Sequence, residues 1–286
     1  MSRADAHNEA AEFCADLVRS HDFVRYASSL FLPARQRRAV LALYAFNVEI
    51  SRVREVVSQP LAGEIRLQWW TDMLAGTGHG GIEGNPVADE LNLVIQHSEL
   101  PVERLSRLVD EHQFDLYNDP MPTMAALESY LNDTFCTLFA LAAEISGWRI
   151  PEIEHLARHA GLAQGMARVV SAFPLDSSRR QLFLPLQLLE RQGSSMEEAF
   201  SGKENPKVRA ALDDLLGNAR VHLDAALTLL ESMPPEVRPA FLPLAVVARE
   251  LRRMSRADTN LFTPSTTSRL RTLWTLWRAS RSDLFS

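Results

Sequence analysis

Apolar residues recur along much of the chain at steps of three and four positions, which is the repeat of an amphipathic helix. The longest regular run, from Val208 to Leu230, places one apolar stripe on a single helix that Pro234 and Pro235 should end. Similar runs, with the prolines and glycines between them, predict helices at residues 8–20, 34–58, 61–75, 85–99, 101–118, 123–147, 151–173, 236–255 and 265–281. The pattern therefore predicts an all-α protein.

Composition agrees with this interpretation. Leucine and alanine are abundant, whereas isoleucine, threonine and tyrosine, which favour strands, are sparse. Hydrophobic residues make up 46% of the 286 residues and charged residues 23%, which excludes a disordered or fibrous chain. Because no internal repeat or long polar linker interrupts the helical segments, we expect one helical domain over residues 1–286.

Charge and targeting patterns exclude further classes of protein. Thirty Lys and Arg against 36 Asp and Glu give a net charge of −6, so nothing in the overall charge favours nucleic-acid binding. No charge-free stretch approaches the roughly 20 residues of a transmembrane helix, and the first ten residues contain no apolar segment of a secretory signal. We expect a cytoplasmic protein with, at most, peripheral contact with the inner membrane. Cys14 and Cys136 lack the spacing of a metal or redox motif and are predicted to be packed thiols.

Several short motifs share their order and spacing with a known family. In chain order they are Asp22-Phe23, Ala42-Leu43-Tyr44-Ala45-Phe46, Leu67-Gln68-Trp69-Trp70, Asn85-Pro86-Val87, Tyr130, Gly161-Leu162-Ala163 and Leu182-Phe183-Leu184-Pro185. Together, over about residues 20–200, they resemble the squalene/phytoene synthase family. The resemblance implies a single-domain, all-α, isoprenoid-synthase-like helical bundle around a central cavity.

The resemblance also implies a chemistry, in which Mg²⁺ ions held by two aspartate-rich helical motifs ionise a prenyl diphosphate. Carboxylates four residues apart share one face of a helix and can hold the same metal cluster. The bound cations stabilise the charge that develops on the departing diphosphate. In this chain the first motif should follow Tyr44-Ala45-Phe46, and the second should lie between Gly161 and Pro185.

The residues at those positions depart from the family pattern. The first motif holds Ser51, Arg52 and Glu55, and the second holds Arg168, Ser171, Ala172, Leu175 and Asp176. Two carboxylates therefore remain where the family has six, and a second guanidinium has been added, a group that cannot ligate a metal. We expect no metal site, no catalytic residue and no bound cofactor, and we expect Pro174 to interrupt the second helix.

Other candidate residues surround these motifs. Asp22 stands where the family usually has a phosphate-contacting serine and should repel diphosphate, and Gly165 replaces the usual glutamine. A repurposed cavity or anion site would draw on Asp22, Tyr44, Asn47, Val48, Ser51, Arg52, Glu55, Tyr130, Gly165, Arg168 and Ser171. Two interpretations stay open for Arg52. Either it pairs with Glu49 or Glu55, as in most mixed-charge runs, or it joins Arg168 in binding a carboxylate, phosphate or lipid head group.

A second set of strings narrows the resemblance. Ala45-Phe46-Asn47-Val48-Glu49, Arg66-Leu67-Gln68-Trp69-Trp70, Ala163-Gln164-Gly165 and Ser178-Arg179-Arg180-Gln181 resemble a divergent branch of the family. Its eukaryotic member is a mitochondrial assembly factor for respiratory complex I, which implies an accessory role and a complex I subunit or assembly intermediate as partner. Two alternatives remain: a head-to-head prenyl diphosphate synthase with a degenerate Mg²⁺ site at Glu55 and Asp176, and a carrier of a lipid or isoprenoid ligand.

Two further patterns have both a structural and a functional interpretation. His155 and His159 lie four apart, a spacing that suits a metal, but without a third ligand in sequence they are expected to be ordinary surface or capping residues. Near the C-terminus, leucines, Trp274 and Trp277 alternate with arginines in a basic aromatic helix. Such a helix can lie at a membrane interface or close a helical bundle, and we favour the second, with both tryptophans buried.

Overall fold

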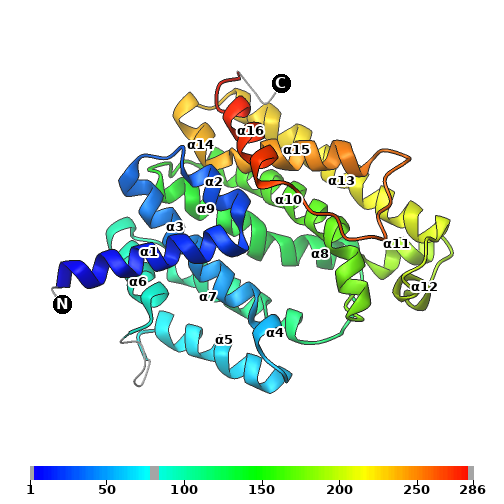
Figure 1. Ribbon diagram of the computed structural model, residues 1–286, viewed down its shortest axis with the longest axis horizontal. Helices are drawn as coiled ribbons and strands as arrows, with labels where there is room; N and C mark the ends of the chain where they lie inside the picture. The colour runs from blue at the N-terminus through cyan, green and yellow to red at the C-terminus, as the bar shows by residue number, and fades with distance from the viewer. Residues whose placement is uncertain (1–2, 78–83, 283–286) are drawn as a thin grey trace. The chain divides into compact units, whose positions relative to one another are not determined.

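The computed structural model describes residues 3–77 and 84–282 (Figure 1). That part of the chain consists of helices and the segments that connect them, without a strand. The all-α prediction is confirmed. Part of the glycine-rich turn between residues 76 and 84 lies outside the described residues. None of the described helices is both long enough and apolar enough to cross a membrane.

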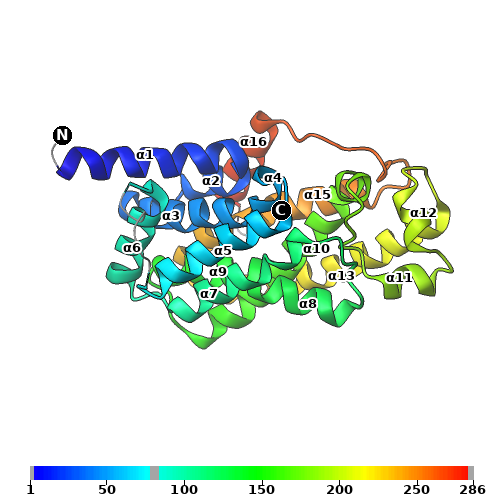
Figure 2. The same ribbon diagram turned by 90° about the horizontal axis from the view of Figure 1, so that it is seen from below.

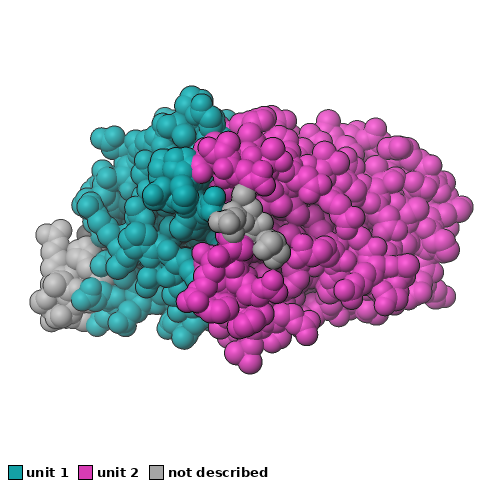
Figure 3. All heavy atoms as spheres, turned by 90° about the horizontal axis from the view of Figure 1, so that it is seen from above, with its two compact units in different colours: residues 1–116, 137–153, 234–243 teal, residues 117–136, 154–233, 244–286 magenta. Residues whose placement is uncertain are grey.

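The chain separates into two compact units, each assembled from segments that are distant in sequence (Figure 3). Unit 1 comprises Met1–Leu116, Thr137–Ile153 and Pro234–Pro243, and unit 2 comprises Tyr117–Cys136, Glu154–Met233 and Leu244–Ser286. Because both units take residues from early and late parts of the chain, neither corresponds to a continuous stretch of sequence. The expected single domain over residues 1–286 stays a prediction.

Unit 1 is built around a buried helix. Its helices are α1 (Arg3–His21), α2 (Phe23–Ser29), α3 (Ala34–Ser51), α4 (Val53–Val56), α5 (Pro60–Leu74), α6 (Pro86–Ser98), α7 (Val102–Glu111), η1 (Phe114–Leu116), α9 (Thr137–Ile145), η3 (Pro235–Val237) and α14 (Arg238–Phe241). α3 is buried on every side from Val40 to Val48, and α1 and α6 pack against it (Figure 2). Phe46 of α3 meets Trp70 of α5 edge to face, with ring centroids 5.0 Å apart.

Unit 2 is dominated by two long helices. It contains α8 (Met124–Leu131), the π-helix η2 (Asn132–Cys136), most of α10 (Pro151–Ser178), α11 (Leu186–Arg191), α12 (Met196–Phe200), α13 (Pro206–Glu231), α15 (Pro243–Met254) and α16 (Arg269–Ala279). The apolar stripe predicted between residues 208 and 230 is buried along its whole length on α13. Asn205 caps this helix by accepting hydrogen bonds from the backbone N–H groups of Lys207 and Val208.

Several helix boundaries differ from the prediction. The segment expected at 34–58 breaks at Arg52, whose backbone (φ −104°, ψ 8°) leaves the helical region between α3 and α4. The segment expected at 123–147 contains the π-helix η2, where α10 makes its closest approach. Three short helices, α2, α11 and α12, were not predicted, because fewer than eight residues give too little periodicity.

The burial predicted for the two thiols is confirmed, whereas that predicted for the C-terminal tryptophans is not. Cys14 and Cys136 are free and buried, as predicted, and burial raises the pKa of each thiol to about 12. The predicted burial of the C-terminal tryptophans is wrong. α16 packs through Thr272 and Leu276 instead, so Trp274 and Trp277 lie on its outer side and are exposed.

Candidate functional site

The first motif lies where α3 ends and α4 begins. Tyr44, Asn47 and Val48 are buried on α3, and Ser51 is its last residue. Arg52 occupies the junction, and its Nε donates a hydrogen bond to Oε2 of Glu55 on α4 at 2.7 Å. The structure therefore contains the ion pair of the first interpretation of Arg52.

Neighbouring charges on this edge of unit 1 are also engaged. Glu49 forms an ion pair with Nη2 of Arg66 at 2.8 Å, and Nη1 of Arg54 donates a hydrogen bond to the backbone carbonyl of Asp115 at 2.9 Å. Desolvation, with the nearby guanidinium of Arg52, lowers the pKa of His21 below its usual value. Separate polar contacts from the run Glu49 to Glu55 therefore tie α3 to α5 and α4 to η1.

Asp22 is held by Arg25, a residue that was not among the candidates from the sequence. Its side chain caps α2 by accepting the backbone N–H of Arg25 at 3.1 Å, and its other oxygen pairs with Nη1 of Arg25 at 2.7 Å. The buried guanidinium of Arg25 also lies 5.5 Å from the ring centroid of Tyr44, whose pKa burial raises to about 12. Because its carboxylate is paired, Asp22 would repel a diphosphate less than expected.

The second motif lies on α10, which runs through Pro174 and ends at Ser178. The expectation that Pro174 interrupts this helix is wrong: the ring removes one backbone donor, but the helix continues for another four residues beyond it. Arg168 and Ser171 are exposed, with the Ser171 hydroxyl donating to the Arg168 carbonyl at 3.1 Å. Ala172 is buried, whereas Leu175 is exposed.

Two other unit 2 candidates serve packing. A methyl group added at Gly165 would lie 2.4 Å from Cδ2 of Leu131, so glutamine, the family's usual residue, would displace that side chain. The buried ring of Tyr130 packs against Phe183, with centroids 5.7 Å apart. Both residues therefore help to hold α8 and the segment after α10 in place.

These residues do not fit a cluster of Mg²⁺ ions. In the first motif the single carboxylate, Glu55, already neutralises Arg52, and in the second motif Ala172 and Leu175 carry no oxygen donor in their side chains. Among the described residues, no three histidine, cysteine or acidic side chains are grouped closely enough to hold a metal ion. Arg52 belongs to unit 1 and Arg168 to unit 2, so a shared anion site for the two guanidiniums stays a prediction.

The histidines of α10 have a partner that sequence spacing did not reveal. Nδ1 of His159 lies 2.9 Å from Nδ1 of His222 on α13, and the His155 ring meets His159 edge to face. Burial lowers the pKa of both His159 and His222 below 6.5. His155 is exposed, whereas His159 is half-buried. Arg25 offered a sequence clue, since an ion pair three residues after a capping aspartate is a local pattern, whereas His222 offered none.

Comparison with known proteins places these features in a family. The squalene/phytoene synthase model matches residues 18–278. A mouse protein named NADH dehydrogenase (ubiquinone) complex I, assembly factor 6 is 33% identical over 253 residues, covering 88% of this chain and 76% of the relative. A phytoene synthase from Rhodobacter capsulatus is 24% identical over 232 residues, covering 81% of this chain and 68% of the relative.

A solved structure agrees at the level of the fold. The crystal structure of a dehydrosqualene synthase in complex with a ligand matches with a TM-score of 0.82 at 15% identity, covering 95% of each chain. At that identity the likeness speaks for the fold alone. The family model covers most of the chain, and the resemblance drawn from the sequence motifs is confirmed. The chain belongs to the squalene/phytoene synthase family.

Proposed function

We propose that this chain is a non-catalytic member of its family that assists the assembly of respiratory complex I. The observation that carries the proposal is the state of the first motif, where Arg52 and Glu55 form an ion pair at 2.7 Å in place of a metal-binding carboxylate cluster. The partner would be a complex I subunit or assembly intermediate. The protein would act in the cytoplasm, with peripheral contact with the inner membrane.

Similarity to other proteins supports this assignment over catalysis. Identity to the mouse protein named for complex I assembly is 33%, against 24% to the Rhodobacter phytoene synthase, and the alignment with the former is also longer. The similarity includes the region of the altered motifs, because it spans 88% of the chain. Relatives named as assembly factors are therefore the better guide to the function of this chain.

The charges at the motif positions support the same conclusion. To bind Mg²⁺, Glu55 would have to leave Arg52, and a cation placed there would lie beside a permanent positive charge. Asp176 would be the sole carboxylate among the second motif's positions. Two carboxylates on separate helices cannot replace the six of the family pattern.

The altered site would still be able to bind an anion. Arg168 is exposed, and within the described residues its guanidinium has no ion-pair or hydrogen-bond partner, which suits a carboxylate, a phosphate or a lipid head group. Arg52, being paired, would contribute only by exchanging Glu55 for the ligand. Of the two guanidiniums, Arg168 is therefore the better candidate.

The test has a biochemical and a cellular part. The purified protein, incubated with farnesyl or geranylgeranyl diphosphate and Mg²⁺, should form no product above a heat-inactivated control, while an authentic phytoene synthase does. Deletion of the gene in a host with complex I should reduce the assembled complex on native gels, and the wild-type gene should restore it. Turnover in the first part, or normal assembly in the second, would contradict the proposal.

A catalytic alternative rests on family membership and on the carboxylates that remain at Glu55 and Asp176. It predicts Mg²⁺-dependent product that is lost in both the Glu55→Gln and the Asp176→Asn variants. A third role, carriage of a lipid or isoprenoid, predicts neither product nor an assembly defect. It predicts instead that native protein purified from cells contains an extractable apolar ligand. Product formation, complex I assembly and an extractable apolar ligand therefore separate the three functions.

A further inference from the structure

The outer face of α16 is apolar and exposed. We define this face as Leu270, Leu273, Trp274 and Trp277, whose exposed fractions are 78%, 37%, 59% and 40%. Their spacing of three and four residues places them on one side of the helix. The two indole rings stack with their centroids 5.0 Å apart. Four large apolar side chains gathered on about two turns of helix form a contiguous surface, unlike scattered exposed residues.

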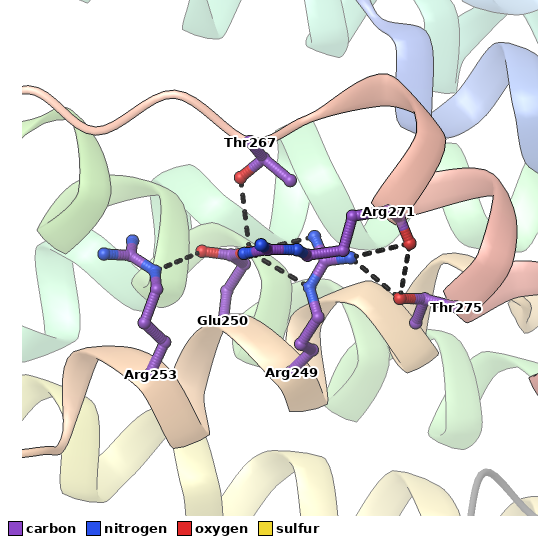
Figure 4. Close-up of polar contacts among 6 residues, drawn as sticks. All are labelled: Arg249, Glu250, Arg253, Thr267, Arg271 and Thr275. Atoms are coloured by element: carbon purple, nitrogen blue, oxygen red, sulfur yellow. Dashed lines mark hydrogen bonds and ion pairs between the residues drawn. The ribbon is translucent and has the colours of Figure 1, made fainter.

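The opposite side of α16 is anchored to unit 2. Thr272, Leu276 and Ala279 are buried, and Nη1 of Arg249 on α15 donates to the Thr275 hydroxyl at 2.7 Å and to the Arg271 carbonyl at 3.2 Å (Figure 4). The helix is therefore fixed by its inner side, so the outer face cannot turn inward without breaking these contacts.

The same network fixes the segment that leads into α16. Glu250 accepts hydrogen bonds from Nη2 of Arg249 at 3.0 Å, from Nε of Arg253 at 2.9 Å and from the hydroxyl of Thr267 at 3.3 Å (Figure 4). Burial acts to raise the pKa of Glu250, but the bonds from Arg253 and Arg249 outweigh it, so the pKa is lowered. Glu250 thus stays charged and holds Thr267, just before the helix, against α15.

The charged residues of α16, and Arg281 just after it, are all positive. Arg269 flanks it on one side of the helix, and Arg271 and Arg278 flank it on the other. Arg281 lies over the Trp277 ring at 4.3 Å from its centroid. No acidic residue occurs between Asp258 and Asp283, although the chain as a whole has a net charge of −6. The basic character is therefore local to this helix.

We propose that the outer face of α16 binds the surface of an anionic phospholipid membrane. An amphipathic helix that lies in the interface buries its apolar side at the acyl boundary and places cationic side chains among the head groups. Tryptophan favours this depth, and flanking arginines can reach the phosphates. With 11 residues, α16 lies on the membrane and does not cross it.

Charge separates this occupant from a second copy of the chain. Two outer faces brought together around a twofold axis would oppose the arginines of one copy to those of the other, without an acidic residue on either helix to compensate. An anionic lipid surface instead complements every charge on the helix. The inference rests on one part of the proposed function, the peripheral membrane contact, and assigns that contact to a surface outside the motif positions. Vesicle flotation therefore tests it separately from the prenyl-transfer and assembly experiments.

The experiment measures flotation of the full-length protein with two kinds of vesicle, phosphatidylcholine alone and an equal mixture with phosphatidylglycerol. We expect binding to the mixed vesicles, weakened by salt, and at least about tenfold less to the neutral ones. The Arg278→Glu/Arg281→Glu variant should bind the mixed vesicles at least about 25-fold more weakly. The Trp274→Ser/Trp277→Ser variant should bind the mixed vesicles at least about tenfold more weakly than the wild-type protein.

Matched controls come from α11 and α13 of the same unit. Arg191→Glu/Arg220→Glu reverses two exposed arginines, and Val221→Ser removes an exposed apolar side chain, so both should bind like wild type. Leu270→Ser, at the most exposed position of the face, repeats the apolar test should the double tryptophan variant misfold. Equal binding to neutral vesicles, no binding to mixed vesicles, or unchanged binding of folded Trp274→Ser/Trp277→Ser and Leu270→Ser would overturn the proposal. The proposal would also be overturned if the wild-type protein were a dimer that did not float with vesicles and if Trp274→Ser/Trp277→Ser were a monomer.

Discussion

Replacing Gly161 with alanine should destabilise the protein even though alanine is the better helix former. Gly161 lies within α10, and a methyl group there would lie 2.4 Å from both the Cα and the backbone nitrogen of Cys136 in η2. Backbone atoms cannot rotate away from the added group as the end of a side chain can. The methyl group can therefore be accommodated only if α10 and η2 move apart.

Two other glycines in helices of unit 2 calibrate the size of this effect. Gly217 of α13 is exposed with nothing within 4 Å of an added methyl group, so Gly217→Ala should raise the free energy of unfolding by about 1 kcal/mol. Gly161→Ala receives the same helical gain, but overpacking costs about 1–3 kcal/mol or more. At Gly165 the clash is with the flexible end of Leu131, which can shift at smaller cost.

Urea unfolding followed by far-ultraviolet circular dichroism would rank the variants. We expect Gly217→Ala to be more stable than wild type, Gly165→Ala to lie near wild type, and Gly161→Ala to lose up to about 2 kcal/mol once the helical gain is set against the overpacking cost. A Gly161→Ala protein as stable as Gly217→Ala would refute the close approach of α10 to η2. A loss of the same size at Gly217 would show instead that helical glycines in this fold are sensitive for some other reason.

Three further predictions concern charge. Arg52→Glu breaks an ion pair whose side chains are 31% and 38% exposed, so it should lower the free energy of unfolding in urea by about 1 kcal/mol or less. The charge-swapped variant Arg52→Glu/Glu55→Arg should restore the lost stability. An equal loss in the control Arg220→Glu would contradict a specific pair. Millimolar Mg²⁺ should leave the melting temperature unchanged, and a saturable rise abolished by Asp176→Ala would revive the catalytic alternative. The pKa values of His159 and His222 are lowered in the folded protein, so the unfolded chain binds more protons and the free energy of unfolding should fall as pH drops below 6.5. In unfolding measured from pH 5 to 8, His222→Gln should weaken this pH dependence, whereas the exposed-site control His97→Gln should leave it unchanged.

Local periodicity predicted the fold where a helix buries one side. α13 illustrates this, because its stripe of apolar residues is buried as the spacing required. α16 shows the limit of the same reasoning. Its leucines and tryptophans have a helical repeat, but the repeat cannot tell which side faces the protein. The buried side carries Thr272 and Ala279 beside Leu276. The choice depends on contacts with Arg249 and Glu250, far away in sequence, so it was not available from the pattern.

At the motif positions, sequence identified the residues but not their partners. The local pair Arg52–Glu55 was among the open alternatives because its members are three residues apart. The pair of Arg25 with Asp22 is also local, at three residues. The contact of Arg25 with Tyr44, in contrast, joins α2 to α3, and that of His159 with His222 joins residues 63 positions apart. Tertiary contacts of this kind carry no periodic trace in the chain, so a single sequence could not place them.

The arrangement on α10 explains why the fold persists without metal-binding carboxylates. Close packing falls on Gly161 and Gly165, where added atoms would meet Cys136 and Leu131, and these positions lie one to three turns before the second motif. Ala172, in contrast, is buried at a position where the family has an acidic residue. A carboxylate buried there without a cation would cost several kcal/mol, so in a protein that binds no metal an uncharged side chain is the more stable choice. Under the proposed non-catalytic function, absence of the metal and absence of the carboxylate therefore reinforce each other, and Ala172→Asp alone should lower stability without producing Mg²⁺ binding.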